Sequence, residues 1–362
     1  MYEVIKMKLS PLWIGELKIS LPIIQGGMGI GVSGAKLASA VANEGGVGVI
    51  SGVAIGYRES DFEKNSLKAN LRALINEIKT ARKLSPKGII GVNFLVAMSN
   101  YNEMVKASLA EGIDLIISGA GLPTNLPDLV KGFKTKIAPI VSSGKAARII
   151  SMLWDKKYNV VADLVIVEGP EAGGHLGFSE EELGRKEKIS LIDRVKDVME
   201  ALKPFEEKHN KKIPVIAAGG IYDGLDIAKY IKAGASGVQM ATRFVTTEEC
   251  DADIRYKEAY LSSKEEDILI VKSPLGMPGR AINNGFIKKL ASANEKIKGC
   301  YMCLKGCNPL VAPYCISKAL INAVRGNIEE GLIFVGSNAY KTDKIVSVNE
   351  LISKLKHEIE EV

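Results

Sequence analysis

Eight short runs of apolar and β-branched residues recur along the first 245 residues, with glycine, serine or asparagine at their ends. Each run is followed by a stretch with helical periodicity, and this alternation indicates parallel strands joined by crossover helices. The runs cover residues 22–26, 47–52, 89–95, 115–119, 137–143, 164–169, 214–219 and 237–244. Eight such strands close a barrel, so we expect an α/β fold of the (β/α)8 TIM-barrel type. An open, doubly wound sheet is the alternative fold.

The alternation of apolar strand-like runs and helical stretches ends after residue 245. Residues 246–263 form a charged stretch of helical character, residues 272–285 are rich in proline, glycine and asparagine, and the part after residue 288 again has helical periodicity. The sequence therefore predicts a barrel domain over residues 1–245. A mostly helical extension over residues 246–362 is expected to pack on the barrel as a lid.

The charge pattern argues against large anionic partners. The chain has 48 Lys and Arg against 42 Asp and Glu, but the basic residues are scattered and do not form the stripe that a nucleic-acid footprint needs. No eighteen consecutive residues are apolar, so no membrane span is expected. Charged residues are spread over the first twenty positions, where a signal peptide would have an apolar core. We expect a cytoplasmic protein with a small-molecule substrate. The sequence is compatible with a monomer and with a homodimer.

The ends of the predicted strands are polar and rich in glycine, and barrel enzymes place their sites at these ends. Gly219 and Gly220 end the seventh run, and Met240, Ala241 and Thr242 follow in the eighth. Backbone N–H groups at such a position favour an anion, so a phosphorylated cofactor is expected there. A tight turn without a ligand is the simpler interpretation of the two glycines.

Residues 168–177, with the sequence EGPEAGGHLG, form the most informative motif. Four glycines and two carboxylates accompany His175 at the end of the sixth run. An imidazole exchanges a proton near neutral pH, and the glycines allow a flat ligand to approach the backbone. His175 is therefore the candidate catalytic residue, whereas an isolated histidine would more simply be structural.

Five segments in order resemble the nitronate monooxygenase family, which has also been called 2-nitropropane dioxygenase and includes the flavin-dependent enoyl-ACP reductase II enzymes. They are PIIQGGM at 22–28, GVN at 91–93, EGPEAGGHLG at 168–177, IAAGGI at 216–221 and GVQMATRF at 237–244. The resemblance spans roughly residues 11–281. It implies one non-covalently bound FMN at the barrel mouth and, in the reductases, NAD(P)H as co-substrate.

The resemblance also implies which positions contact the FMN. The implied contacts are Gly27, Met28 and Asn93 for the ring, Ala218, Gly219, Gly220, Met240, Ala241 and Thr242 around the phosphate, and Gly173, Ser143 and Ser190 as further positions. Residues 178–188 form an insertion relative to the family pattern, just before Ser190.

Three functions remain open at this point. The first is FMN-dependent oxidation of alkyl nitronates or nitroalkanes with O2, in which the histidine matching His175 lies near the substrate. The second is an NAD(P)H-dependent FMN enoyl-ACP or quinone reductase, because the same motif accompanies both reactions. The third is a non-catalytic barrel that binds a phosphorylated ligand, since a barrel fold does not dictate function.

Four of the five cysteines, Cys300, Cys303, Cys307 and Cys315, lie within sixteen residues outside this resemblance. Their spacing is compatible with a metal or iron–sulfur site, although it matches no well-defined zinc or ferredoxin pattern. Reduced thiols in a helical cap are the alternative, because Cys303 and Cys307 would share one helix face.

Overall fold

Eight parallel strands close into a barrel in the computed structural model, which describes residues 7, 9–185, 189–292, 294–295 and 297–362. The strands are β3 (Ile23–Gln25), β4 (Val47–Ser51), β5 (Ile89–Leu95), β6 (Leu115–Gly119), β7 (Lys136–Val141), β8 (Val165–Glu168), β10 (Val215–Ala218) and β11 (Gly237–Met240). The order β10-β11-β3-β4-β5-β6-β7-β8 confirms the predicted (β/α)8 barrel and excludes the open sheet. The eighth run was predicted too long, because helix α9 (Thr242–Val245) follows β11 almost directly.

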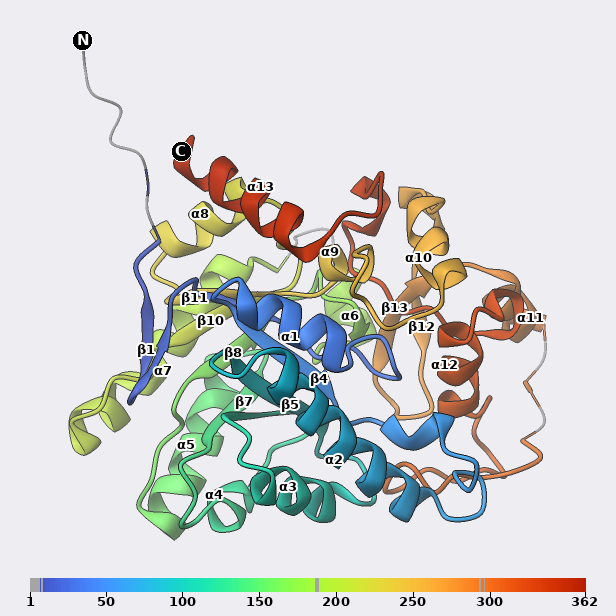
Figure 1. The fold of residues 1–362 in the computed structure, drawn as a ribbon, viewed down its shortest axis with the longest axis horizontal. Helices are drawn as coiled ribbons and strands as arrows, with labels where there is room; N and C mark the ends of the chain where they lie inside the picture. The colour runs from blue at the N-terminus through green and yellow to red at the C-terminus, as the bar shows by residue number, and fades with distance from the viewer. Residues whose placement is uncertain (1–6, 8, 186–188, 293, 296) are drawn as a thin grey trace.

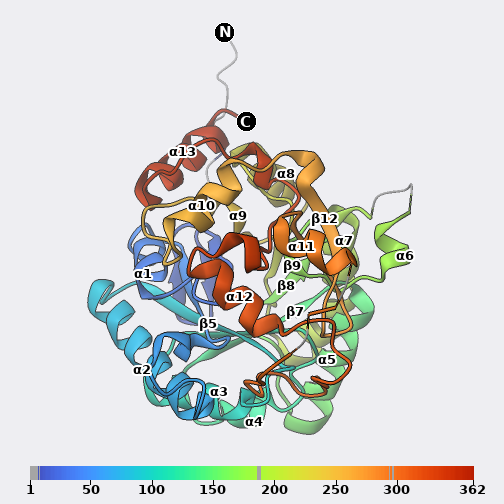
Figure 2. The same cartoon turned by 90° about the vertical axis from the view of Figure 1, so that its right-hand side faces the viewer.

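Helices surround this barrel between its strands (Figures 1 and 2). They are α1 (Ala35–Asn43), α2 (Ser66–Leu84), α3 (Tyr101–Ala110), α4 (Leu126–Leu129), α5 (Gly144–Tyr158), α7 (Leu191–His209) and α8 (Gly224–Lys232). Several begin at a side chain that accepts a hydrogen bond from the first turn, such as Asn65 for α2 and Asp223 for α8. The insertion contains α6 (Glu180–Leu183), and residues 186–188 of it lie outside the described residues.

Apolar side chains fill the interior of the barrel and cover the end at which its strands begin. A hairpin of β1 (Leu12–Ile14) and β2 (Leu17–Ile19) covers the amino-terminal ends of the strands. Its Leu12 and Ile14 belong to the same buried cluster as Ile24 and Ile166 inside the barrel. The floor is therefore closed, and a ligand can reach the strand ends only from the opposite side.

The carboxyl-terminal extension covers that opposite side, where Figure 2 shows α12 and the neighbouring extension elements. It contains α10 (Ile254–Leu261), β12 (Ile268–Lys272), β13 (Pro278–Ile282), α11 (Gly285–Ser292), α12 (Ile316–Val324) and α13 (Val348–Glu360). A second apolar core joins Ile30 and Tyr57 of the barrel loops to Val324 and Leu332 of the extension. The extension thus packs onto the barrel mouth.

The extension also contains strands that the sequence pattern did not indicate. The proline, glycine and asparagine content of residues 272–285 predicts a loop, and this prediction is wrong at Pro278–Ile282, which forms β13 between β12 and the two-residue strand β9 (Gly174–His175). Proline and glycine disfavour a strand locally, and here antiparallel pairing on both sides outweighs that preference. This small sheet connects the His175 segment to the extension.

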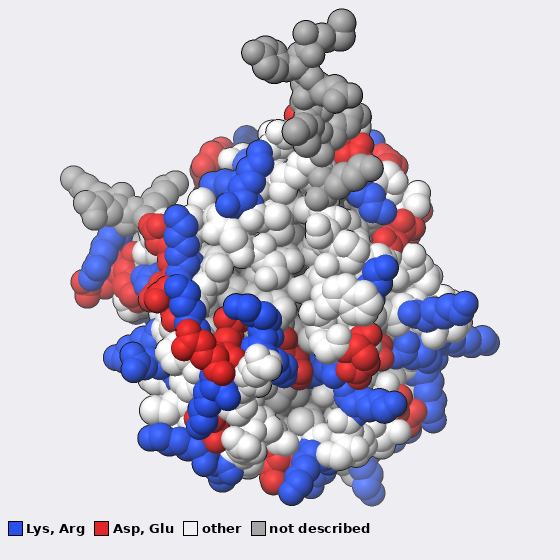
Figure 3. Space-filling model, turned by 90° about the vertical axis from the view of Figure 1, so that its left-hand side faces the viewer, with Lys and Arg blue, Asp and Glu red and all other residues white. Residues whose placement is uncertain are grey.

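The last helix returns to the barrel. Helix α13 packs on α8 and α1, and Glu358 accepts a hydrogen bond from the backbone N–H of Gly224 at 2.8 Å. None of the helices within the described ranges is long and apolar enough to cross a bilayer. On the face drawn in Figure 3, basic and acidic side chains are interspersed rather than gathered by sign.

Candidate active site

A pocket with a volume of about 390 Å³ lies at the carboxyl ends of the barrel strands, beneath the extension. This volume falls within the range of small-molecule and cofactor sites. Eleven predicted site residues line it: Gly27, Met28, Asn93, Gly173, His175, Ala218, Gly219, Gly220, Met240, Ala241 and Thr242. Segments that are far apart in the sequence therefore meet in one cavity, as the strand-end argument predicted.

Two predicted contacts, Ser143 and Ser190, are not among the residues that line the pocket. The Ser143 hydroxyl accepts a hydrogen bond from the N–H of Ala146 at 3.3 Å and caps α5, and Ser190 caps α7 in the same way through Asp193 at 3.2 Å. Ser142, one residue before the first cap, lines the pocket instead. Both serines therefore cap helices, and their contact with FMN stays a prediction.

Glycines shape the pocket where a side chain would not fit. Gly219 and Gly220 have φ of +98° and +76°, a region that favours glycine. A Cβ on Gly27 would collide with the side chain of Asn93, and one on Gly173 would lie 2.6 Å from the backbone of Val335. All four glycines line the cavity, so a flat or phosphorylated ligand would approach their backbone directly.

The loop around residues 336–338 closes the glycine side of the pocket. Asn338 donates a hydrogen bond through Nδ2 to the carbonyl of Gly220 at 2.7 Å, and the N–H of Gly336 donates to Thr242 Oγ1 at 3.3 Å. Among the described residues, no lysine or arginine lines the pocket. An anion here would consequently depend on backbone N–H groups and hydroxyls, as at other glycine-rich cradles.

His175 is held by the extension. It lies in β9, opposite Gly279 of β13, and its Nε2 lies 2.7 Å from the hydroxyl oxygen of Ser273. The ring of Phe334 packs against it edge to face, with 5.0 Å between the ring centroids. Burial lowers the pKa of His175 to about 4, so the imidazole is neutral at neutral pH.

Arg280 fixes the loop that carries His175. Its Nη1 donates to the carbonyls of Pro170 and Ala172, at 2.7 and 2.6 Å. The guanidinium is largely buried, and this burial lowers the pKa of Arg280. A charged donor shared by two carbonyls stabilises the turn between β8 and β9 more than a neutral donor would.

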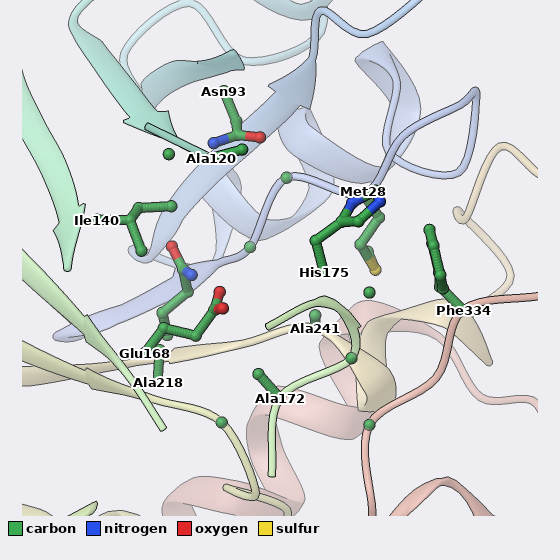
Figure 4. Close-up of a pocket in the computed structure, with 18 of the residues that line it drawn as sticks. Met28, Asn93, Ala120, Ile140, Glu168, Ala172, His175, Ala218, Ala241 and Phe334 are labelled. Carbon is green, nitrogen blue, oxygen red and sulfur yellow. The ribbon is translucent and has the colours of Figure 1, made fainter. Parts of the chain in front are cut away.

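Glu168 lies on the other side of the pocket from His175 and Phe334 (Figure 4). It ends β8, and burial raises the pKa of Glu168 to about 8. The carboxyl is therefore mostly protonated at neutral pH and can donate a hydrogen bond. Neither Glu168 nor His175 carries a full charge in the pocket under these conditions.

Comparison with known proteins agrees with this geometry. The nitronate monooxygenase family matches residues 10–358. A protein of Staphylococcus saprophyticus named "Probable nitronate monooxygenase" is 31% identical over 312 residues, which cover 80% of this chain and 83% of that protein. This chain belongs to the nitronate monooxygenase family. Membership of this family implies an oxidoreductase.

Solved structures place the nitronate monooxygenase fold over nearly the whole chain. FabK from Thermotoga maritima superposes with a TM-score of 0.73 at 30% identity, and the match covers 95% of this chain and 94% of that one. Nitroalkane oxidase from Streptomyces ansochromogenes gives a TM-score of 0.72 at 23% identity, covering 95% and 96%, which supports the fold alone.

Three residues that hold His175 or its loop in this nitronate monooxygenase family member are not indicated by the sequence pattern. Ser273, Arg280 and Phe334 all come from the extension, at positions without a recognisable motif. Gln239, which lies in the segment GVQMATRF, also lines the pocket, and the alternation of side chains along β11 could have indicated that it faces the barrel interior.

The four clustered cysteines do not converge on a metal position. Cys300 is exposed, whereas Cys303, Cys307 and Cys315 are partly buried. Within the described residues, no three His, Cys, Asp or Glu side chains are arranged to hold a metal ion, so the arrangement does not support the predicted metal or iron–sulfur site. Burial raises the pKa of Cys303 to about 11, which keeps it a neutral thiol.

Proposed function

We propose that this protein is an FMN-dependent oxidoreductase that oxidises alkyl nitronates and nitroalkanes with O2. The observation that carries the proposal is a neutral imidazole, His175, held by Ser273 beside a glycine-shaped pocket. Family membership supports an oxidoreductase, and the pocket chemistry supports the choice of cofactor and substrate.

The pocket residues fit an FMN. Ser51 Oγ and Gln239 Oε1 are buried without a hydrogen-bond partner in the protein, and both residues line the cavity, so a polar ligand would satisfy them. Gly219, Gly220 and Thr242 would hold the phosphate, and Gly27 would adjoin the ring. When bound, FMN supplies the redox chemistry: it accepts electrons from the substrate and passes them to O2.

The weak basicity of His175 favours the nitronate anion over the neutral nitroalkane as the form that is oxidised. A base with a pKa of about 4 removes a carbon-bound proton poorly at neutral pH, because general bases are most effective near the working pH. The neutral imidazole can instead donate an N–H to an anionic nitronate oxygen. Protonation of Glu168 removes a negative charge that would repel such an anion.

A reductase is the second candidate. The likeness to FabK from Thermotoga maritima, at 30% identity over 95% of the chain, favours it. In this alternative NAD(P)H would reduce the flavin, and an enoyl thioester or a quinone would receive the electrons. His175 and Ser273 would then orient a carbonyl group rather than a nitronate.

An anaerobic stopped-flow experiment separates the two candidates. FMN-loaded protein is mixed with a primary nitronate, with the corresponding nitroalkane, or with NADH and NADPH, and the loss of flavin absorbance is recorded. We expect fast bleaching by the nitronate, slower bleaching by the nitroalkane and little by the nicotinamides. Bleaching by NADH or NADPH alone would replace the oxidase proposal with the reductase, and no bleaching by any of them would refute both.

A further inference from the structure

A small side pocket opens next to His175, on the side away from the glycine cradle residues. It has a volume of about 40 Å³, and it shares Val53, Leu95, His175 and Leu320 with the wall of the main pocket. A substrate whose reacting carbon lies at His175 would therefore have this space within reach of its remaining carbon atoms.

The walls of the side pocket come from seven parts of the chain. Five of them are the loop after β4, the start of α2, the end of β5 with the residues that follow it, the cysteine-bearing segment around residues 301–304 and the start of α12. The other two are His175 of β9 and Leu275 in the loop between β12 and β13. The cysteine segment is fixed by backbone hydrogen bonds from Ser99 N to the Cys303 carbonyl, at 3.1 Å, and from Lys305 N to the Ala97 carbonyl, at 2.8 Å. The Cys303 wall is therefore a built feature of the site.

The chemistry of these walls suits an aliphatic group. Leu95, Met98, Ile316 and Leu320 are among the apolar lining residues, and none of the described lining residues carries a carboxylate, an ammonium or a guanidinium group. The Ser66 hydroxyl already has a hydrogen-bond partner, because it donates to the Tyr301 carbonyl at 3.1 Å.

Asn70 Oδ1 accepts the Gly56 N–H at 2.8 Å, and the Cys303 thiol stays neutral because burial raises its pKa. Water in such a space has few strong partners, so an alkyl group displaces it favourably. One water molecule needs about 10–15 Å³ of such volume. The side pocket thus has room for a chain of about three carbon atoms.

We propose that this side pocket binds the aliphatic chain of the substrate and that Cys303 limits the chain length, so that short primary alkyl nitronates are the preferred class. The inference rests on the proposed nitronate oxidation. It gives the cysteine segment a role in specificity, independent of any metal.

The test compares kcat/KM of the FMN-loaded enzyme for the nitronates of nitroethane through 1-nitrohexane. Burial of one methylene contributes about 0.8 kcal/mol, which corresponds to about a fourfold gain in kcat/KM per carbon. We expect this gain to continue to 1-nitrobutane, whose chain extends three carbons beyond the reacting carbon, and to end or reverse in longer substrates.

Variants at Cys303 should move this limit in opposite directions. Cys303→Leu fills the space and should shift the optimum to shorter chains, whereas Cys303→Ala should shift it to longer ones. Cys303→Val is a smaller filling change in case the leucine variant does not fold. Cys300→Ala is the matched control, because Cys300 is exposed and lines neither pocket.

Binding of the neutral nitroalkanes, measured by calorimetry under argon, provides a readout besides turnover. A chain-length profile that does not respond to Cys303 variants overturns the side-pocket assignment even if nitronates are good substrates. Equal losses in Cys300→Ala and Cys303→Ala also overturn it, because they would indicate a joint role of the thiols. Chain-dependent binding without nitronate oxidation supports the side pocket and refutes the proposed function alone.

Discussion

Replacing Glu168 by glutamine should remove a pH dependence of stability that the buried carboxyl imposes. Burial raises the pKa of Glu168 from 4.5 to about 8, so the folded protein retains a proton that the unfolded chain releases between these values. A group whose folded-state pKa is raised contributes stability that is present below pH 4.5 and is lost as the pH rises through 8. Glutamine has nearly the same size and stays neutral throughout.

The magnitude follows from the width of this window. Each pKa unit corresponds to about 1.36 kcal/mol. Between pH 5 and pH 8, the free energy of unfolding of the wild-type protein should therefore fall by about 3–4 kcal/mol relative to that of Glu168→Gln. All other titrating groups are shared by the two proteins and cancel in the difference.

Urea unfolding of protein freed of small ligands, followed by the fluorescence of buried Trp154, measures this difference at pH 5, 6, 7 and 8. Glu200→Gln is the control, because the side chain of Glu200 is 71% exposed and should give a difference that does not change with pH. If the wild-type and Glu168→Gln stabilities stayed parallel from pH 5 to 8, the carboxyl would be ionised and the argument from burial would be refuted.

Three further variants test the architecture of the site. Ser273→Ala removes the hydroxyl that is hydrogen-bonded to the imidazole and should lower kcat/KM for a nitronate about tenfold, since one such bond contributes about 1–1.5 kcal/mol. Ser262→Ala is the control, because Ser262 is exposed. Equal kcat/KM values for the two variants would contradict the role of the hydrogen bond. Gly220→Ala, at φ +76°, should weaken FMN binding at least tenfold in a fluorescence titration. Gly112→Ala is the control, because Gly112 also has positive φ but lies in open space, and this variant should bind FMN normally. Equal affinities of the two variants for FMN would argue against a phosphate site at Gly219 and Gly220. Arg280→Met leaves the carbonyls of Pro170 and Ala172 without their donor and should lower the free energy of unfolding by about 2–4 kcal/mol in urea titrations. Amide hydrogen exchange in residues 168–177 should become faster in this variant. Unchanged exchange there would show that other contacts hold the loop.

The barrel could be predicted from the sequence because each of its strands is a local pattern. The run at residues 89–95 is apolar except for Asn93, as expected for a strand that is covered on both faces, and its predicted bounds agree with those of β5. The glycine positions were likewise local signals: Gly219 and Gly220 have backbone angles that other residues adopt with difficulty, so their place at a strand end already indicated a special turn.

The parts of the site that escaped prediction depend on pairing over long sequence distances. Ser273 and Arg280 reach the His175 loop only because β13 pairs with β9, and neither strand has a periodic pattern long enough to be recognised. Ser143 and Ser190 show the opposite case. A serine just before a helical stretch is a common cap, and both serines cap a helix here, so the sequence offers a local role for them beside the predicted contact with FMN.

The pairing of β9 with β13 also has a consequence for the order in which the enzyme becomes competent during synthesis. Chains emerge from the ribosome amino terminus first, and every barrel strand has been made by residue 240. The partner strand of His175 and the ring of Phe334 are made later. A nascent chain can therefore close its barrel while its histidine is still unanchored, so we expect redox activity to begin only when translation has passed the extension.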